Sequence, residues 1–170
     1  RAKTFSLGDD RHVITAKDAL AKKAANVGEK AVVIGGGMVG CELSLWLTKD
    51  LGKQVTIIEA LPKLLAVNGP ICSANSEMLE RLVPFHGTDV CCRTTAVKAT
   101  DNGLVIRNLE TNEEETIPAD TIILAVGFTP DQELYDAMQE TEELYAIGDC
   151  KEFHNVHSAV WDAFEVANHI

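Results

Sequence analysis

The sequence predicts an α/β fold: a Rossmann-like βαβ unit that carries a three-stranded antiparallel β-meander and is followed by a trailing strand and helix. Two observations lead to this prediction. Short β-branched runs alternate with a helical segment over residues 31–58, which is the order of elements in a parallel sheet. Residues 95–117 contain short alternating segments around an Asn-Gly pair, which is typical of antiparallel hairpins.

The composition is that of an ordinary globular protein. Of the 170 residues, 46% are hydrophobic and 24% are charged, and the formal net charge is −11. This charge would repel nucleic-acid backbones and anionic membrane surfaces, so we expect neither as a partner. The longest apolar run, at 31–47, is interrupted by Glu42 and closely spaced glycines. We therefore expect no membrane span, no signal peptide and a cytoplasmic location.

The cysteines indicate a reducing compartment. The chain has five cysteines, none of them in CxxC spacing: Cys41, Cys72, Cys91, Cys92 and Cys150. We interpret all five as reduced, small apolar residues rather than as disulfide partners or metal ligands. His154 and His157 have HxxH spacing, but no third ligand is evident, so the sequence predicts no metal site.

The first elements build the βαβ unit. Residues 16–25 have helical composition, and we expect Gly28 to end that helix,. A strand at 31–34, a helix at 38–49 and a strand at 54–58 follow in order,.

The second half changes character. Its expected elements are a helix at 75–85, β structure from Val90 onward, strands at 96–100, 104–107, 113–117, 121–126 and 144–147, and a helix from about 156 to 170. Asn102-Gly103 predicts a type I′ turn in the first hairpin. Trp46 and Trp161 lie at core spacings within their helices, and we interpret both as packing residues.

A glycine-rich turn carries the clearest chemistry. The motif consists of Gly35, Gly36, Gly37, Met38, Val39 and Gly40. It fits GxGxxG and lies directly after a strand and at the start of a helix, as a dinucleotide site requires. Gly35 permits the tight turn, Gly37 lets the backbone approach a pyrophosphate, and Gly40 permits close packing of helix and strand. Free N–H groups at the helix start then face the phosphates.

Acidic residues near this turn bear on specificity. Glu59 ends the next strand, about 20 residues beyond the motif, where a carboxylate can accept hydrogen bonds from both ribose hydroxyls of adenosine. It would repel a 2′-phosphate, and the residues after it include Lys63 but no Arg, so NAD(H) is favoured over NADP(H). The alternative is that Lys63 reaches the phosphate. Glu42 either faces solvent or faces the nicotinamide end of the cofactor.

Three ordered motifs resemble one known family. Residues 30–42 resemble the start of the NAD-binding insert of flavoprotein oxidoreductases with two dinucleotide sites. Residues 119–130 resemble the segment that closes this insert, and residues 144–150 resemble the second FAD motif. Details such as Glu133-Leu-Tyr-Asp-Ala137 are most similar to the C-terminal region of the 2-enoate reductase and 2,4-dienoyl-CoA reductase group. These are NADH:flavin oxidoreductases related to old yellow enzyme.

The resemblance implies roles for individual residues. The motif glycines would bind pyrophosphate and Glu59 the adenosine ribose, while Glu42 and Gly127 would lie near nicotinamide. In the second FAD motif, Gly148 would belong to the cofactor-binding turn and Asp149 would hydrogen-bond the ribityl chain of FAD. His157 and Ser158 would start the helix whose N-terminus points at the flavin, where it would stabilise negative charge on reduction.

The resemblance also implies a domain plan. Residues 1–28 would be a lead-in from the flanking FAD half, 29–130 the NAD(H)-binding domain, and 131–170 the FAD-motif segment with the closing helix. Because the chain begins at Arg1 without Met, we expect a piece of a longer protein whose preceding part supplies the first FAD motif, FMN and an iron–sulfur cluster. Alone, the chain would bind nucleotide without turnover, and an unpaired 144–147 strand edge would favour a homodimer.

Two functions remain open from the sequence. The first is an NADH-binding domain that presents nicotinamide for hydride transfer to FAD, in a protein that reduces activated C=C bonds. The second is a non-catalytic ADP- or NAD-binding module of a flavoprotein, with a sensing or structural role, that uses the same glycine turn.

Overall fold

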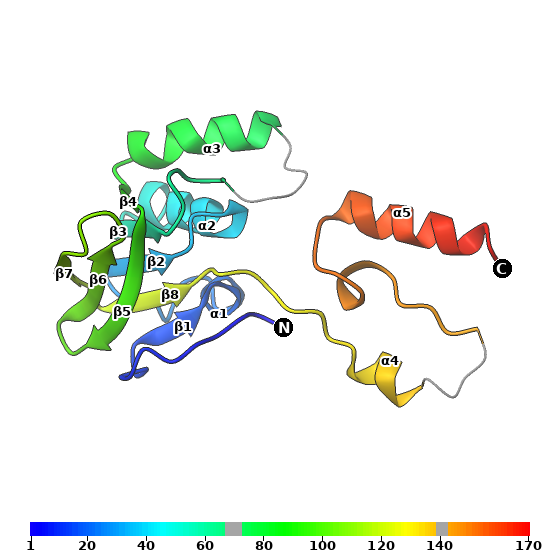
Figure 1. Cartoon of the computed structure of the whole chain (residues 1–170). Helices are drawn as coiled ribbons and strands as arrows, with labels where there is room; N and C mark the ends of the chain where they lie inside the picture. Colours follow the sequence, from blue (N-terminus) through cyan, green and yellow to red (C-terminus); the bar gives the residue numbers. More distant parts are fainter. Residues whose placement is uncertain (67–72, 139–142) are drawn as a thin grey trace. The chain divides into compact units, whose positions relative to one another are not determined.

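The computed structural model describes residues 1–66, 73–138 and 143–170, which form two compact units (Figure 1). The larger unit is Ala2–Gly127, and the smaller unit is Phe128–Ile170 together with Arg1. The segment 2–28, expected as a lead-in, contributes a strand and a helix to the larger unit. Cys72 lies outside the described residues.

A five-stranded parallel sheet forms the centre of the larger unit. Its order is β1 (Val13–Thr15), β8 (Thr121–Leu124), β2 (Lys30–Ile34), β3 (Gln54–Glu59) and β4 (Asp89–Cys92). Every neighbouring pair is parallel, so the predicted βαβ unit and α/β fold class are confirmed. Parallel order brings the carboxyl ends of all five strands to one edge, where ligands of such sheets bind.

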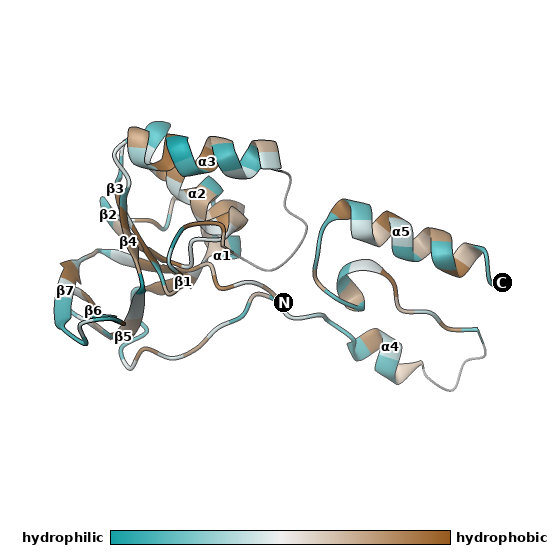
Figure 2. Cartoon of the chain, turned by 45° about the horizontal axis from the view of Figure 1, so that its top comes forward, coloured by the Kyte–Doolittle hydropathy of each residue, from teal (hydrophilic) through white to brown (hydrophobic). Residues whose placement is uncertain are grey.

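Helices cover one face of this sheet. They are α1 (Ala16–Ala21), α2 (Met38–Lys49) and α3 (Ser73–Phe85). Val33 and Ile57 are fully buried in the core on this face, to which α3 contributes Leu79 and Val83. Figure 2 shows hydrophobic and hydrophilic residues alternating along α3, as expected for a helix with one buried side,.

The antiparallel meander covers the opposite face. It consists of β5 (Thr94–Thr100), β6 (Gly103–Asn108) and β7 (Glu114–Pro118). Val32 and Ile58 on the sheet pack in one cluster with Leu104 and Ile106 of the meander. Successive strand residues therefore point to opposite cores, which explains why the parallel strands are apolar throughout.

The predicted type I′ turn is wrong. Thr100 pairs with Gly103, so the two residues between the strands are Asp101 and Asn102. A type I′ turn needs positive φ at both, and neither is among the described residues with positive φ. Gly103 has the positive φ instead, at +134°, and a Cβ there would lie 2.1 Å from the Ile117 carbonyl oxygen. Gly103 is thus required by close approach to β7.

The first helix ends earlier than predicted. α1 stops at Ala21, and Lys23 and Ala24 adopt left-handed backbone with φ of +49° and +57°. Ala24 is buried, and its N–H donates to the Ala19 carbonyl oxygen, so core packing closes the helix before Gly28. Gly28 serves another purpose, because a Cβ there would lie 2.5 Å from Asp120 Cβ.

The smaller unit contains α4 (Glu133–Ala137), a 3₁₀ turn η1 (Gly148–Cys150) and α5 (Val156–Ala167). The predicted strand at 144–147 is wrong, because these residues form no strand in the structure. A strand needs a hydrogen-bonded neighbour, and the smaller unit has no strand within its described residues. The strand edge on which the homodimer expectation depended is therefore not formed. Trp161 is also not a packing residue here, since it is 56% exposed.

Candidate nucleotide-binding site

The glycine turn joins β2 to α2 with no room for side chains. Gly35 has φ +110°, and a Cβ there would lie 2.6 Å from the Ala125 carbonyl oxygen. A Cβ on Gly40 would lie 1.9 Å from the Gly35 carbonyl oxygen, well inside any van der Waals contact. The glycines at these two positions are therefore required by close approach of the turn to its own helix and to the end of β8.

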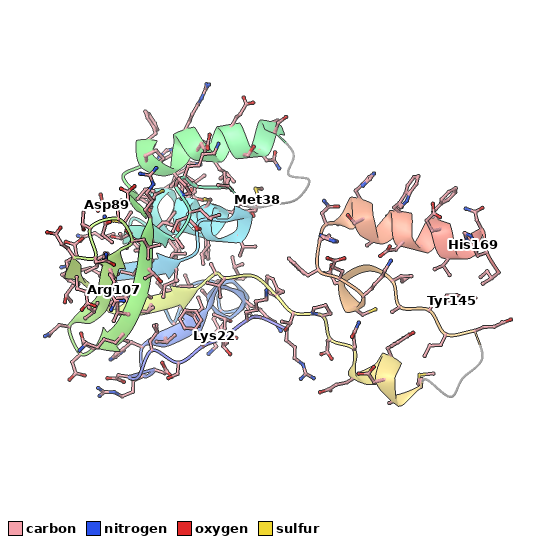
Figure 3. The ribbon with its side chains drawn as sticks, in the orientation of Figure 1. Lys22, Met38, Asp89, Arg107, Tyr145 and His169 are labelled. Carbon is pink, nitrogen blue, oxygen red and sulfur yellow. The ribbon has the colours of Figure 1, made fainter. Side chains whose placement is uncertain are left out.

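The start of α2 offers unpaired N–H donors. Gly37 is the N-cap residue in extended conformation, with φ −75° and ψ −173°, and its carbonyl accepts the first helical bond from the Cys41 N–H at 2.9 Å. The N–H groups of Met38, Val39 and Gly40 have no acceptor within the part of the chain that the structure describes. Met38 is labelled at this end of α2 in Figure 3. Such a helix start is suited to bind a phosphate group.

Glu59 lies at the same edge, at the end of β3. Its Oε2 accepts a hydrogen bond from the Gly36 N–H at 2.6 Å, and its Oε1 accepts one from the Leu61 N–H at 2.8 Å. The two bonds fix the half-buried carboxylate against the glycine turn. A carboxylate has about four acceptor positions, so two remain for ribose hydroxyl groups.

The sequence did not reveal the loop that follows Glu59 as part of this site. The Leu65 N–H donates to the Gly36 carbonyl oxygen at 2.8 Å, and Leu64 and Leu65 are buried in the helix-side core. A Cβ on Gly36 would lie 2.5 Å from Leu64 Cδ2. Leu65 has φ +57°, a conformation that leucine rarely adopts, so no local sequence signal could have predicted this loop.

The other predicted residues of this unit have different surroundings. Ala125, which directly follows β8, contacts the glycine turn, and Gly127 lies two residues further with φ +92°. Glu42 is exposed on α2, one turn beyond the unpaired N–H groups. Its placement towards nicotinamide stays a prediction. The Lys63 ammonium lies 3.6 Å from the Glu80 carboxylate.

Cys41 is buried beneath the turn. Its thiol donates to the Gly36 carbonyl oxygen at 3.4 Å, and burial, with a smaller contribution from the Glu59 charge, raises the pKa of the thiol to about 12. The pKa values of Cys91 and Cys92 are also raised, chiefly by burial. Cys41, Cys91, Cys92 and Cys150 are all free thiols.

We expect Cys41 to resist alkylation in the folded chain. At pH 8 the raised pKa leaves about a thousandfold less thiolate than an ordinary cysteine has, and the thiolate is the reactive form. Mass spectrometry after iodoacetamide treatment should find Cys41 unmodified until urea unfolds the chain, with the half-exposed Cys150 as the internal control. Equal labelling of both thiols in the folded chain would contradict the buried position.

The predicted flavin residues lie in the smaller unit. Gly148 has φ +59°, and a Cβ there would lie 3.1 Å from Ala159 Cβ of α5. Asp149 is exposed on η1, and His157 is exposed in the first turn of α5. The Asn155 side chain caps α5 and accepts a bond from the Ser158 N–H at 2.9 Å. The structure thus joins Gly148 to α5, and the binding roles of Asp149, His157 and Ser158 stay predictions.

Asp162 anchors the turn that carries Asp149. Its Oδ2 accepts a hydrogen bond from the Gly148 N–H at 3.0 Å, and its Oδ1 pairs with the Lys151 ammonium at 2.8 Å. The Lys151 side chain, followed by the Gly148 N–H, lowers the pKa of the Asp162 carboxyl. Sequence reasoning did not find Asp162, because no local pattern marks a helix carboxylate that bonds to a preceding turn.

Replacing Asp162 with Asn should loosen this turn. Because the folded-state pKa is depressed, the carboxylate stabilises the turn at pH values above its unfolded pKa of about 3.9 and loses this effect as pH falls through the folded value. Amide exchange at Gly148, corrected for intrinsic rates, should be several-fold faster in D162N than in the parent chain near pH 6, and the difference should vanish at strongly acidic pH. Asp149→Asn is the matched control. Equal protection of the Gly148 amide in D162N and in the parent chain near pH 6 would show that Asp162 does not anchor this turn.

Together, the fold and the turn define a Rossmann-like dinucleotide-binding domain. The model of the pyridine nucleotide-disulphide oxidoreductase family matches residues 6–163. The chain belongs to this family of oxidoreductases, whose members use NAD(P)- and FAD-type dinucleotide cofactors.

Individual relatives narrow the comparison. The chain is 41% identical to a cinnamate reductase of Clostridium sporogenes over 170 residues, which are 99% of this chain and 25% of that protein. It is 30% identical to a metal reductase of Desulforamulus reducens over 184 residues, covering 91% of this chain and 27% of that one. The chain therefore spans about a quarter of the length of these two relatives. The cinnamate reductase match confirms the resemblance to the enoate reductase group.

Solved structures share the fold. A 2-naphthoyl-CoA reductase complex superposes with a TM-score of 0.85 at 24% identity, covering 100% of this chain and 25% of that one. Thioredoxin reductase of T. acidophilum gives a TM-score of 0.69 at 20% identity, and the match covers 98% of this chain and 61% of that one. Within the described residues, no helix combines the length and apolar character needed to cross a membrane.

Proposed function

We propose that this chain is the NAD(H)-binding domain of a larger flavoprotein oxidoreductase, in which it presents nicotinamide to a flavin held by flanking segments. The observation that carries the proposal is the set of unpaired N–H groups at Met38, Val39 and Gly40, beside a turn that Gly35 and Gly40 keep free of side chains. This cradle fits a pyrophosphate. When bound, the nicotinamide supplies a hydride and the flavin accepts it.

The residues of this chain then bind and orient the nucleotide. The α2 N-terminus neutralises the pyrophosphate through its N–H groups and dipole. Glu59 accepts from the ribose hydroxyl groups while the Gly36 and Leu61 N–H groups hold its carboxylate in place. A charge held in this way would lie against a 2′-phosphate, so we propose that NAD(H) binds in preference to NADP(H). Gly127 and Glu42 would lie towards the nicotinamide.

The similar proteins suggest a reaction for the larger protein to which this chain would belong. We propose reduction of an activated C=C bond, which the name of the 41% identical cinnamate reductase supports. Asp149 and the start of α5 at His157 and Ser158 would contribute to FAD binding. FMN and an iron–sulfur cluster would belong to parts of the protein outside this chain, and the cytoplasmic location stays a prediction.

Calorimetric titration of the chain with NADH, NADPH, ADP and FAD in one buffer tests the proposal. We expect NADH to bind more tightly than NADPH and ADP, and FAD to bind weakly or not at all. Equal affinity for NADH and ADP would favour the alternative, a nucleotide-sensing module to which the nicotinamide contributes nothing. Absence of NADH binding would overturn the proposal for this chain, and NADH oxidation without added flavin would contradict its passive role.

A further inference from the structure

The structure brings an arginine to the edge of the predicted ribose subsite from a distant part of the sequence. β4 pairs with β3 so that Cys92 lies opposite Glu59, and Arg93 is the next residue. The Arg93 N–H donates to the Leu61 carbonyl oxygen at 3.1 Å, and the Leu61 N–H in turn donates to Glu59 Oε1 at 2.8 Å. Arg93 is therefore two hydrogen bonds away from the carboxylate expected to select the nucleotide.

Arg93 is held in an unusual conformation and is already paired. Its φ is +54°, and its guanidinium donates to Glu110 Oε1 at 2.6 Å. The Leu109 N–H donates to the Arg93 carbonyl oxygen at 2.7 Å, and the Asn108 side chain accepts from the Glu110 N–H at 2.8 Å. The backbones of both partners are thus held in place, so the two side chains start from fixed positions on neighbouring segments.

We propose that Glu110 is a specificity-determining positioning residue, which neutralises Arg93 and so deprives a 2′-phosphate at the adenosine ribose of a cation from the neighbouring strand end. The proposal rests on the proposed nucleotide site and adds a second determinant to Glu59. A guanidinium released from Glu110 would be available to a phosphate, for which its planar donors are well suited. Adenine nucleotides with and without a 2′-phosphate would therefore distinguish Arg93 paired with Glu110 from Arg93 released from it.

The Lys63–Glu80 pair is a natural comparison. Lys63 follows Glu59 in the same loop, and its ammonium lies 3.6 Å from Glu80, with 71% of the Lys63 side chain exposed. Glu80 lies within α3, but among the described residues no backbone hydrogen bond holds Lys63 in the way that two hold Arg93. A long, exposed ion pair holds its ammonium only weakly, so replacing Glu80 should change specificity less than replacing Glu110.

The test measures affinities of the full chain for adenosine 2′,5′-bisphosphate and for AMP, which differ only in the 2′-phosphate. Glu110→Gln should raise affinity for the bisphosphate by about three- to tenfold while leaving AMP binding unchanged. Arg93→Met in the E110Q background should abolish the gain, and the gain should shrink as salt rises. Glu113→Gln is the matched control, because it removes a charge from the same turn where the Glu113 carboxylate bonds only to Thr111 in the described contacts. Glu80→Gln should give a smaller gain than E110Q.

The outcomes separate this inference from the proposed function. If the parent chain binds neither AMP nor NAD⁺, the proposed nucleotide site fails. If it binds both but E110Q leaves the bisphosphate-to-AMP affinity ratio unchanged, Glu110 has no selective role and only this inference is overturned. A gain in E110Q that survives Arg93→Met would also overturn it, because Arg93 would not be the cation responsible. Unchanged melting temperatures across the variants show that the ratios report on binding.

Discussion

Replacing Gly40 with alanine is expected to disrupt both the fold of the larger unit and its nucleotide binding. The new Cβ would lie 1.9 Å from the Gly35 carbonyl oxygen and 3.4 Å from Ala125 Cβ. The first of these atoms is backbone and cannot rotate away, so α2 must move relative to the glycine turn. We expect a loss of about 3 kcal/mol in the free energy of unfolding and a loss of NADH binding of at least about a hundredfold, because the N–H groups of α2 would no longer converge.

Urea denaturation and calorimetric titration measure the two effects. Ser44→Ala is a matched control, since Ser44 lies one turn later on α2, is fully buried and has a hydroxyl group without a hydrogen-bond partner among the described atoms. This substitution also introduces an alanine into α2, but it should be neutral or slightly stabilising. If Gly40→Ala unfolds at the same urea concentration as Ser44→Ala and binds NADH normally, Gly40 does not lie as close to the Gly35 carbonyl oxygen as described.

Replacing Glu59 with Gln is expected to weaken NADH binding and to narrow the preference over NADPH. The amide retains one acceptor oxygen for the two N–H donors of Gly36 and Leu61, and its NH₂ group faces one donor unproductively. Loss of a charged hydrogen bond costs about 1.5–3 kcal/mol, so NADH affinity should fall by about tenfold to a hundredfold. NADPH affinity should fall less, because a repulsive charge has been removed as well.

Titration of the variant with both nucleotides gives the affinity ratio. Glu59→Asp preserves the charge but shortens the side chain. It should therefore lower the affinity for NADH while the chain still prefers NADH over NADPH. Glu77→Gln removes an equal charge from an exposed position on α3 and should change neither. An unchanged NADH-to-NADPH ratio in E59Q would show that Glu59 is not the selector.

Local sequence pattern was sufficient for the elements that build the larger unit. The β-branched runs and the intervening amphipathic segment predicted β2, α2 and β3 to within one residue at each end, because strand and helix periodicity are properties of neighbouring residues. The GxGxxG spacing likewise predicted where glycine is needed, and the structure places a backbone oxygen within 3 Å of a would-be Cβ at Gly35 and Gly40.

Predictions failed where a distant segment decides the local conformation. Gly103 needs its positive φ to avoid β7, so the hairpin does not form the turn that Asn-Gly alone favours. Residues 144–147 are apolar enough for a strand, but a strand forms only beside a partner, and the described part of the smaller unit offers none. The early end of α1 depends on burial of Ala24 in the core.

The sequence by itself determined the fold class, the glycine turn and the acidic residue at the end of β3, because each depends on residues close together in the chain. Only the tertiary structure decided which groups surround that carboxylate. The order β2, β3, β4 brings the ends of these strands together, where the Glu59 carboxylate accepts from the Gly36 and Leu61 N–H groups and the Arg93 N–H donates to the Leu61 carbonyl oxygen. Strand order is set by burial of both faces of the sheet, a property of the whole domain that no short segment contains.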